Sequence, residues 1–129
     1  MSRKVLDEII ESSGLYFLKD IGFEERTENR FFQKYPLILN NEARFLVILG
    51  PSVESPVHNH AKENMTETHL LFYGSGRFEI YDDKGEVKRK VKLQRGRFHE
   101  PFSTPEHSPQ HKYVAGPEGS ICLALEVYD

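Results

Sequence analysis

Residues 58–76 read HNHAKENMTETHLLFYGSG, and they contain three of the six histidines of this 129-residue chain. His58 and His60 are one residue apart, so both imidazoles project from the same face if the segment is extended. Glu67 opens a strand-like run in which it shares a face with His69. A third imidazole from a distant strand would complete a His/His/Glu/His or His/Glu/His donor set. Such a nitrogen and oxygen set suits Fe(II), Mn(II), Ni(II) or Zn(II).

A histidine pair in a polar loop is by itself more often solvated than bound to metal, so the interpretation depends on the surrounding pattern. Glu67 is followed by six residues and then Gly74, and Gly50 precedes the histidine pair. The other three histidines lie between positions 99 and 111. The chain therefore concentrates its nitrogen donors in one region.

This region resembles the first signature of the cupin superfamily, which runs His-x-His, then a Glu, six residues and a Gly. The gap from His60 to Glu67 is a few residues longer than in the commonest version. A second cupin signature is similar to GRFHEPFSTPEH at residues 96–107, with Pro101 one residue early. The resemblance covers roughly residues 45–127 and implies an all-β double-stranded β-helix, or jelly-roll, barrel. It also implies a divalent metal ion held by His58, His60, Glu67 and His107.

One cupin subfamily is similar in a shorter segment. PEHSPQ, at residues 105–110, resembles the P-H-S-P-Q stretch of 3-hydroxyanthranilate 3,4-dioxygenase. This resemblance implies that His60, Glu67 and His107 form a facial triad for catalytic iron, and that Glu126 contacts the substrate. The arginine that follows this stretch and grips the substrate carboxylate in those enzymes is His111 here, and their second substrate arginine has no counterpart in residues 51–59. The resemblance therefore implies the site architecture but not the substrate.

Three further residues have open roles. His111 could contact the substrate or support a ligand, and it could itself be the third histidine ligand, because HKYVAG resembles the run after the metal histidine in many cupins. The distance from Gly96 favours His107 over His111 for that position. His69 could hydrogen-bond a ligand or the substrate. Glu126 could line a pocket or face water.

The candidate site favours a metal-dependent enzyme of dioxygenase type that acts on a small carboxylated or phenolic compound. Iron is the favoured ion because it would allow oxygen chemistry, whereas Mn, Ni or Zn would polarise a carbonyl. A metal-dependent sugar isomerase is therefore an alternative. A small-molecule-binding or sensor protein without enzymatic activity is the alternative of a different class.

The composition predicts a globular protein whose partner is a small molecule. Hydrophobic residues make up 38% of the chain and aromatic residues 12%, which suits one compact core. A net charge of -3 gives no general attraction to nucleic acid or to anionic membranes, and the longest apolar run, residues 45–49, is too short to span a bilayer. The N-terminus lacks the apolar core of a secretion signal, and Cys122 is the only cysteine, so we predict a cytoplasmic protein. The cupin resemblance implies a homodimer.

We predict a single cupin domain over residues 1–129, with a helix over about 3–13 and the barrel over about 30–128. Apolar residues recur at helical spacing before Gly14, namely Val5, Leu6, Ile9 and Ile10. This short amphipathic helix should cover an open face of the sheet or a partner subunit. The sequence DDKG at residues 82–85 should turn a β-hairpin whose second arm presents a row of lysines to solvent.

Overall fold

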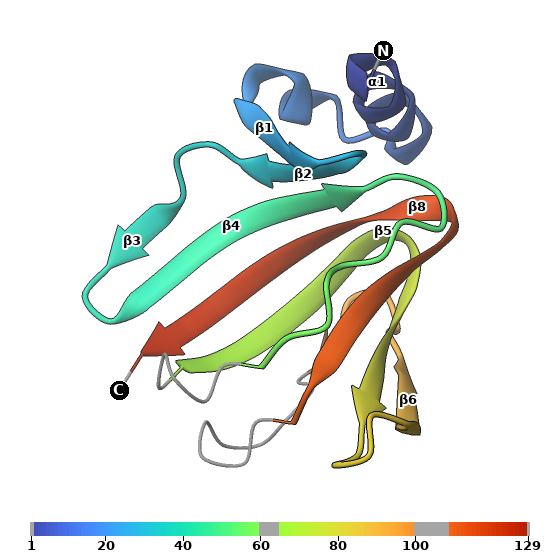
Figure 1. The fold of residues 1–129 in the computed structure, drawn as a ribbon. Helices are drawn as coiled ribbons and strands as arrows, with labels where there is room; N and C mark the ends of the chain where they lie inside the picture. Colours follow the sequence, from blue (N-terminus) through green and yellow to red (C-terminus); the bar gives the residue numbers. More distant parts are fainter. Residues whose placement is uncertain (1, 60–64, 100–108, 129) are drawn as a thin grey trace.

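The computed structural model describes residues 2–59, 65–99 and 109–128, and strands dominate it (Figure 1). Two helical elements come first, the α-helix α1 (Ser2–Ser13) and the 3-10 helix η1 (Tyr16–Asp20). The strands that follow are β1 (Phe23–Thr27), β2 (Arg30–Gln33), β3 (Leu37–Leu39), β4 (Glu42–Leu49), β5 (Met65–Tyr81), β6 (Val87–Lys92), β7 (Phe98–His99) and β8 (His111–Tyr128). The sheet therefore begins earlier than the expected start near residue 30.

The strands form an antiparallel sheet in the order β1-β2-β4-β8-β5-β6, with β3 beside β4 and β7 beside β5. The two longest strands, β5 and β8, pair along most of their lengths and both bend (Figure 1). The first half of β5, from Met65 to Gly74, pairs with the second half of β8. The rest of β5, from Gly76 to Ile80, pairs with the first half of β8. The bend folds the sheet into two layers. The first layer contains β4, the second half of β8 and the first half of β5, and the second layer contains β6 with the other halves of β5 and β8. The predicted all-β jelly-roll barrel is confirmed.

The glycine seven residues after Glu67 marks the bend in β5. Gly74 has a φ of 79°, and a Cβ there would overlap the carbonyl group of Gly119, which has a φ of 82°. Only glycine adopts this backbone conformation without strain and leaves room for the opposing carbonyl. The Gly of the first cupin signature is therefore needed where β5 passes from one layer to the other.

Residues 50–59, which follow β4, cross from the first layer to the second. The Ser55 amide donates to the Tyr113 carbonyl at 2.8 Å, so the segment runs beside the first half of β8. Farther along, His58 and His111 exchange two backbone hydrogen bonds of 2.9 and 2.8 Å. This antiparallel pairing brings together two histidines that are distant in the sequence.

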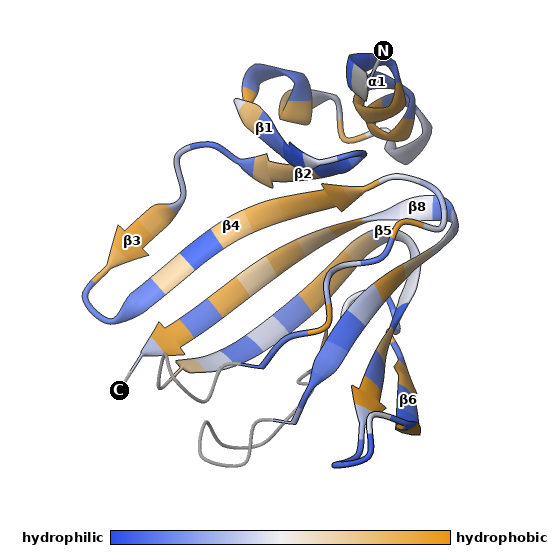
Figure 2. Ribbon diagram, in the orientation of Figure 1, coloured by the Kyte–Doolittle hydropathy of each residue, from blue (hydrophilic) through white to orange (hydrophobic). Residues whose placement is uncertain are grey.

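Side chains alternate across the first layer and form two apolar clusters. The inner core, between the layers, includes Phe32, and the outer core, under α1, includes Leu6. On β4, Val47 and Leu49 point between the layers, whereas Ile48 points outward to α1. Figure 2 shows the alternation as apolar and polar bands across β5 and β8. The apolar stripe of α1 packs on this outer face through Leu6, Ile9 and Ile10, as the prediction of a sheet-covering helix requires.

The β5–β6 hairpin forms where the sequence predicted it. The Asp82 carboxylate accepts hydrogen bonds from the Lys84 and Glu86 amides at 2.9 and 3.0 Å, and Gly85 has a φ of 80°. The β6 lysines are exposed. Among the described residues, α1 is much too short and too polar to serve as a membrane span, and no other helix there qualifies.

Candidate metal centre

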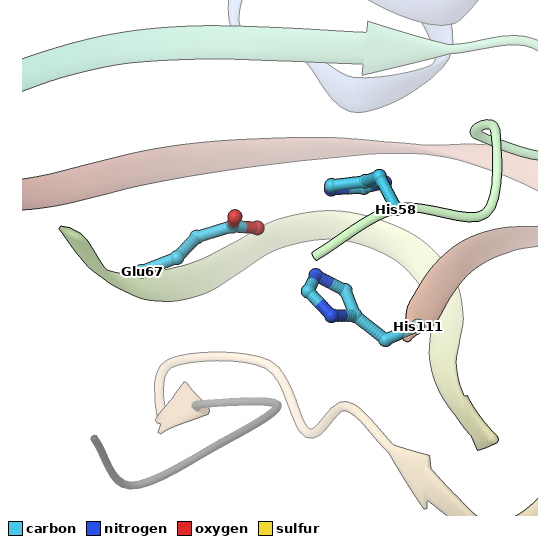
Figure 3. A group of neighbouring side chains, drawn as sticks. All are labelled: His58, Glu67 and His111. Atoms are coloured by element: carbon cyan, nitrogen blue, oxygen red, sulfur yellow. The ribbon is translucent and has the colours of Figure 1, made fainter. Parts of the chain in front are cut away.

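Three side chains from separate parts of the chain converge between the two layers, as Figure 3 shows. His58 comes from the segment after β4, Glu67 from the first half of β5, and His111 from the start of β8. Each offers one donor atom, and these atoms all lie within 4.8 Å of one another. Glu67 is 7% exposed and His111 is 1% exposed, so bulk water competes little for the site. The three donors are spaced closely enough to ligate one ion.

Backbone carbonyl groups hold both imidazoles through the Nδ1 atom, and the two ring planes are tilted by 56° to each other. Nδ1 of His58 lies 2.7 Å from the carbonyl oxygen of Pro56, and Nδ1 of His111 lies 2.9 Å from that of Pro109. Because a carbonyl oxygen only accepts, each Nδ1 carries the proton, and in the neutral imidazole Nε2 carries the lone pair. Metal-binding histidines usually donate their second nitrogen in this way. The repeated Pro-x-His sequence is the local signal that sets both rings.

A histidine on the same strand face supports the carboxylate. His69 Nε2 hydrogen-bonds Glu67 Oε1, so the second carboxylate oxygen can face an ion. The His69 ring stacks on Tyr113 with ring centroids 6.2 Å apart, and it meets the edge of Phe78 at 5.1 Å. Burial acts against a charge on His69, but the Glu67 charge and hydrogen bonds to Cys122 and Glu67 outweigh it and raise the pKa of His69 to about 10. This pair orients Glu67 within the group.

The structure brings together some of the residues that the sequence proposed. His58 and Glu67 lie in the group, and His111 lies in it as well, although the sequence ranked it behind His107. His60 and His107 fall outside the described residues, so their roles, and the preference for His107 over His111, stay predictions.

The structure also places the predicted residue Glu126 and the histidine of β7. Glu126, which pairs with Glu67 across β5 and β8, lines the cavity rather than facing only water. It accepts a hydrogen bond from the Tyr128 hydroxyl at 3.0 Å. His99 is a strand residue whose Nε2 accepts from the Gln94 amide at 3.0 Å. It therefore has a structural contact of its own and is not a member of the three-residue group.

A cavity of about 300 Å³ adjoins the three side chains. Its walls are mainly apolar and aromatic, with Phe32, Phe45 and Phe78 among them. Such a volume and lining are typical of sites for small organic molecules. A concave apolar chamber beside convergent nitrogen and oxygen donors can hold a small molecule against a bound ion.

Two cavity residues were missed by the sequence analysis. Arg26 and Arg30, from the β1–β2 hairpin, line the same cavity. Charged residues usually lie on the solvent face of a strand, so the sequence of this hairpin did not indicate that two of its arginines line a cavity. The available signal was the alternation that places Arg30 on the same strand face as the core residue Phe32.

The two-layered antiparallel sheet, bent around an interior chamber, defines a protein with the cupin fold. A scan against protein-family models and a search of curated proteins find no match to the chain. Solved structures do match. Bacillus subtilis oxalate decarboxylase superposes with a TM-score of 0.65 and 21% identity, over 86% of this chain and 28% of that chain. KdgF from Halomonas sp. superposes with a TM-score of 0.64 and 16% identity, over 86% and 89% of the two chains.

These similarities establish the fold and confirm the cupin resemblance at that level. The chain spans only 28% of the oxalate decarboxylase chain.

Proposed function

We propose that this chain is a metal-dependent cupin enzyme in which His58, Glu67 and His111 hold one divalent ion beside the cavity. The convergence of three donor atoms within 4.8 Å, with both Nδ1 atoms held by backbone carbonyls, carries the proposal. Two neutral imidazoles and one carboxylate suit Fe(II), Mn(II), Ni(II) or Zn(II). His60 and His107 are the further ligands that the sequence suggests.

Three protein donors leave coordination positions for other molecules on an ion of this kind, which would supply Lewis acidity or, if it is iron, oxygen chemistry. The chain's own residues do the positioning. His69 holds one oxygen of Glu67, so the carboxylate cannot rotate freely. Phe32, Phe45 and Phe78 line the cavity and exclude water from an apolar substrate body.

Dioxygenase-type chemistry on a small organic molecule is the activity that we propose first. The support is the resemblance of residues 105–110 to a dioxygenase stretch and the position of Glu126 on the cavity wall. A Lewis-acid reaction is the second candidate, because the same donor set also suits Mn(II), Ni(II) or Zn(II). Oxalate decarboxylase, one of the structural neighbours, has Mn(II) centres, so manganese is one of the metals to test. A cytoplasmic location and a homodimer are part of the same proposal, and fractionation and light scattering would test them.

Elemental analysis of protein purified without added metal, and without a resin that leaches nickel, tests the proposal. We expect near-stoichiometric metal in the wild type and loss of metal in His111→Ala. His99→Ala is the matched control, because His99 lies outside the three-residue group, and it should keep its metal. Circular dichroism confirms that all three proteins are folded.

The metal found then directs the assay. Iron would support the dioxygenase, which oxygen consumption with phenolic and amino-acid substrates would test. Manganese, nickel or zinc would support the Lewis-acid alternative. Absence of metal from the wild type, even after reconstitution, would overturn the enzyme proposal in favour of a binding module.

A further inference from the structure

We propose that Arg26 and Arg30 form an anion-binding subsite of the cavity, which selects a carboxylate carried on a flat apolar molecule. That this molecule is the substrate of the metal group rests on the function proposed above. The subsite itself rests on the geometry of the β1–β2 hairpin.

The two guanidinium groups gather on one aromatic ring. The Cζ atoms of Arg26 and Arg30 lie 4.0 and 5.2 Å from the centroid of Phe32, and all three residues line the cavity. Phe32 packs in the inner core, so the ring is a fixed platform for both cations. Two like charges are thereby held close together at an apolar wall.

The hydrogen bonds of Arg30 leave capacity for a ligand. Its Nη1 donates to Thr27 Oγ1 at 3.2 Å, whereas its Nε is buried and makes no hydrogen bond to any described residue. Burial and the neighbouring Arg26 both lower the pKa of Arg30, because each disfavours its positive charge. An anion within reach would relieve both effects, since a cation that is partly removed from water is stabilised by a nearby opposite charge.

Among the described residues, Arg26 forms an ion pair with Glu24, and that contact is weak. Its Nε lies 3.5 Å from Glu24 Oε1, and both side chains are about half exposed. Exposed ion pairs of this kind contribute little, so a ligand carboxylate can compete with Glu24.

The guanidinium pair favours a planar anion over a spherical one. A guanidinium fork matches the two oxygens of a carboxylate, and the aromatic walls beside it match a flat apolar body. Strand pairing places the arginines away from Glu67. Arg30 is at the level of Leu49 and Ser120, whereas Glu67 is at the level of Glu126, about 20 Å along β8 at roughly 3.3 Å per residue. A molecule anchored by the arginines would extend its other end toward the metal group.

Isothermal titration calorimetry with benzoate and its neutral analogue benzamide tests the subsite. The protein is titrated as purified and again after removal of metal with a chelator. In both states we expect benzoate to bind about tenfold more tightly than benzamide, as a charge-assisted hydrogen bond implies. Arg30→Met and Arg26→Met should each lose most of this preference while keeping their metal content. Arg89→Met, on the exposed β6, should keep both.

The outcomes separate this inference from the proposed function. Equal binding of benzoate and benzamide, or a preference that survives in both cavity variants, overturns the subsite even if the metal is present. A preference that depends on the arginines in a protein that binds no metal supports the subsite and overturns the metal-dependent enzyme. Arg26→Met changes the more exposed arginine, so it keeps the test decisive if Arg30→Met does not fold.

Discussion

Leu6→Ala tests whether α1 stabilises the barrel without taking part in the site. Leu6 is fully buried and packs in the outer core with Ile48 and Ile121, on the face of the first layer that points away from the cavity. The substitution removes three carbon atoms from a packed interior, and nothing polar replaces them. Its effect should therefore be a loss of stability alone.

Leu→Ala at a fully buried position lowers the free energy of unfolding by about 2–5 kcal/mol. We expect about 3 kcal/mol here, because α1 lies on one side of the sheet and can settle partly into the cavity left by the side chain. For a chain of this size, that corresponds to a drop in Tm of about 10 °C. Glu8→Ala is the matched control on the exposed face of α1, where only a 3.9 Å ion pair with Lys4 is lost, and it should cost less than about 0.5 kcal/mol.

Urea unfolding followed by far-UV circular dichroism measures both variants, and elemental analysis measures the metal per folded protein. The Leu6→Ala curve should shift to lower urea with an unchanged m-value, and its metal content should match that of the wild type. A change below about 1 kcal/mol would refute the packing of α1 on the sheet. Loss of metal from folded Leu6→Ala would refute the separation of the outer core from the metal group.

Three further outcomes are expected. Glu67→Gln should bind metal much more weakly than the wild type, because the substitution removes the anionic donor. It preserves the shape of the side chain, so the circular dichroism spectrum should not change. Unchanged metal content would remove Glu67 from the ligand set. Acidification from pH 7 to about pH 4 should release the metal, because histidine nitrogens bind only when deprotonated, and metal retained in ultrafiltration at the lower pH would contradict histidine ligation. Gly76→Ala should lower the Tm by several degrees, because the added Cβ would overlap the Tyr113 hydroxyl. Gly22→Ala, whose Cβ would find only Lys34 Cβ at 3.8 Å, should be close to neutral, and equal melting of the two variants would argue against the close approach at Gly76.

Some parts of the site were readable because they depend on neighbours along the chain. The spacing from Glu67 to Gly74 indicated a cupin strand, and the structure shows that this glycine lies where β5 bends between layers. The period-two alternation placed Glu67 and His69 on one face, and they are hydrogen-bonded there. Spacing along one strand accounts for the shared face, whereas the close approach of Gly119 explains why the bend requires a glycine.

The grouping of ligands could not be read in this way. His111 joins His58 only because the segment after β4 pairs with the first half of β8, and a shift of that register by one residue would turn the His111 ring to the opposite face. Sequence spacing carried no information on this pairing, and it favoured His107. Likewise, Arg26 and Arg30 lie on a hairpin rich in charged residues, and the packing of Phe32 into the inner core places them at the cavity.

The amino-acid sequence by itself determined the all-β class, the covering helix, the hairpin turn and the presence of a histidine-rich site near Glu67. Each of these follows from periodicity, turn chemistry or a motif within a short stretch of chain. The tertiary structure decided which histidines meet, how their rings are oriented and which cations share the cavity. These features depend on strand register between distant segments, and register is set by the burial of whole strand faces rather than by any one residue.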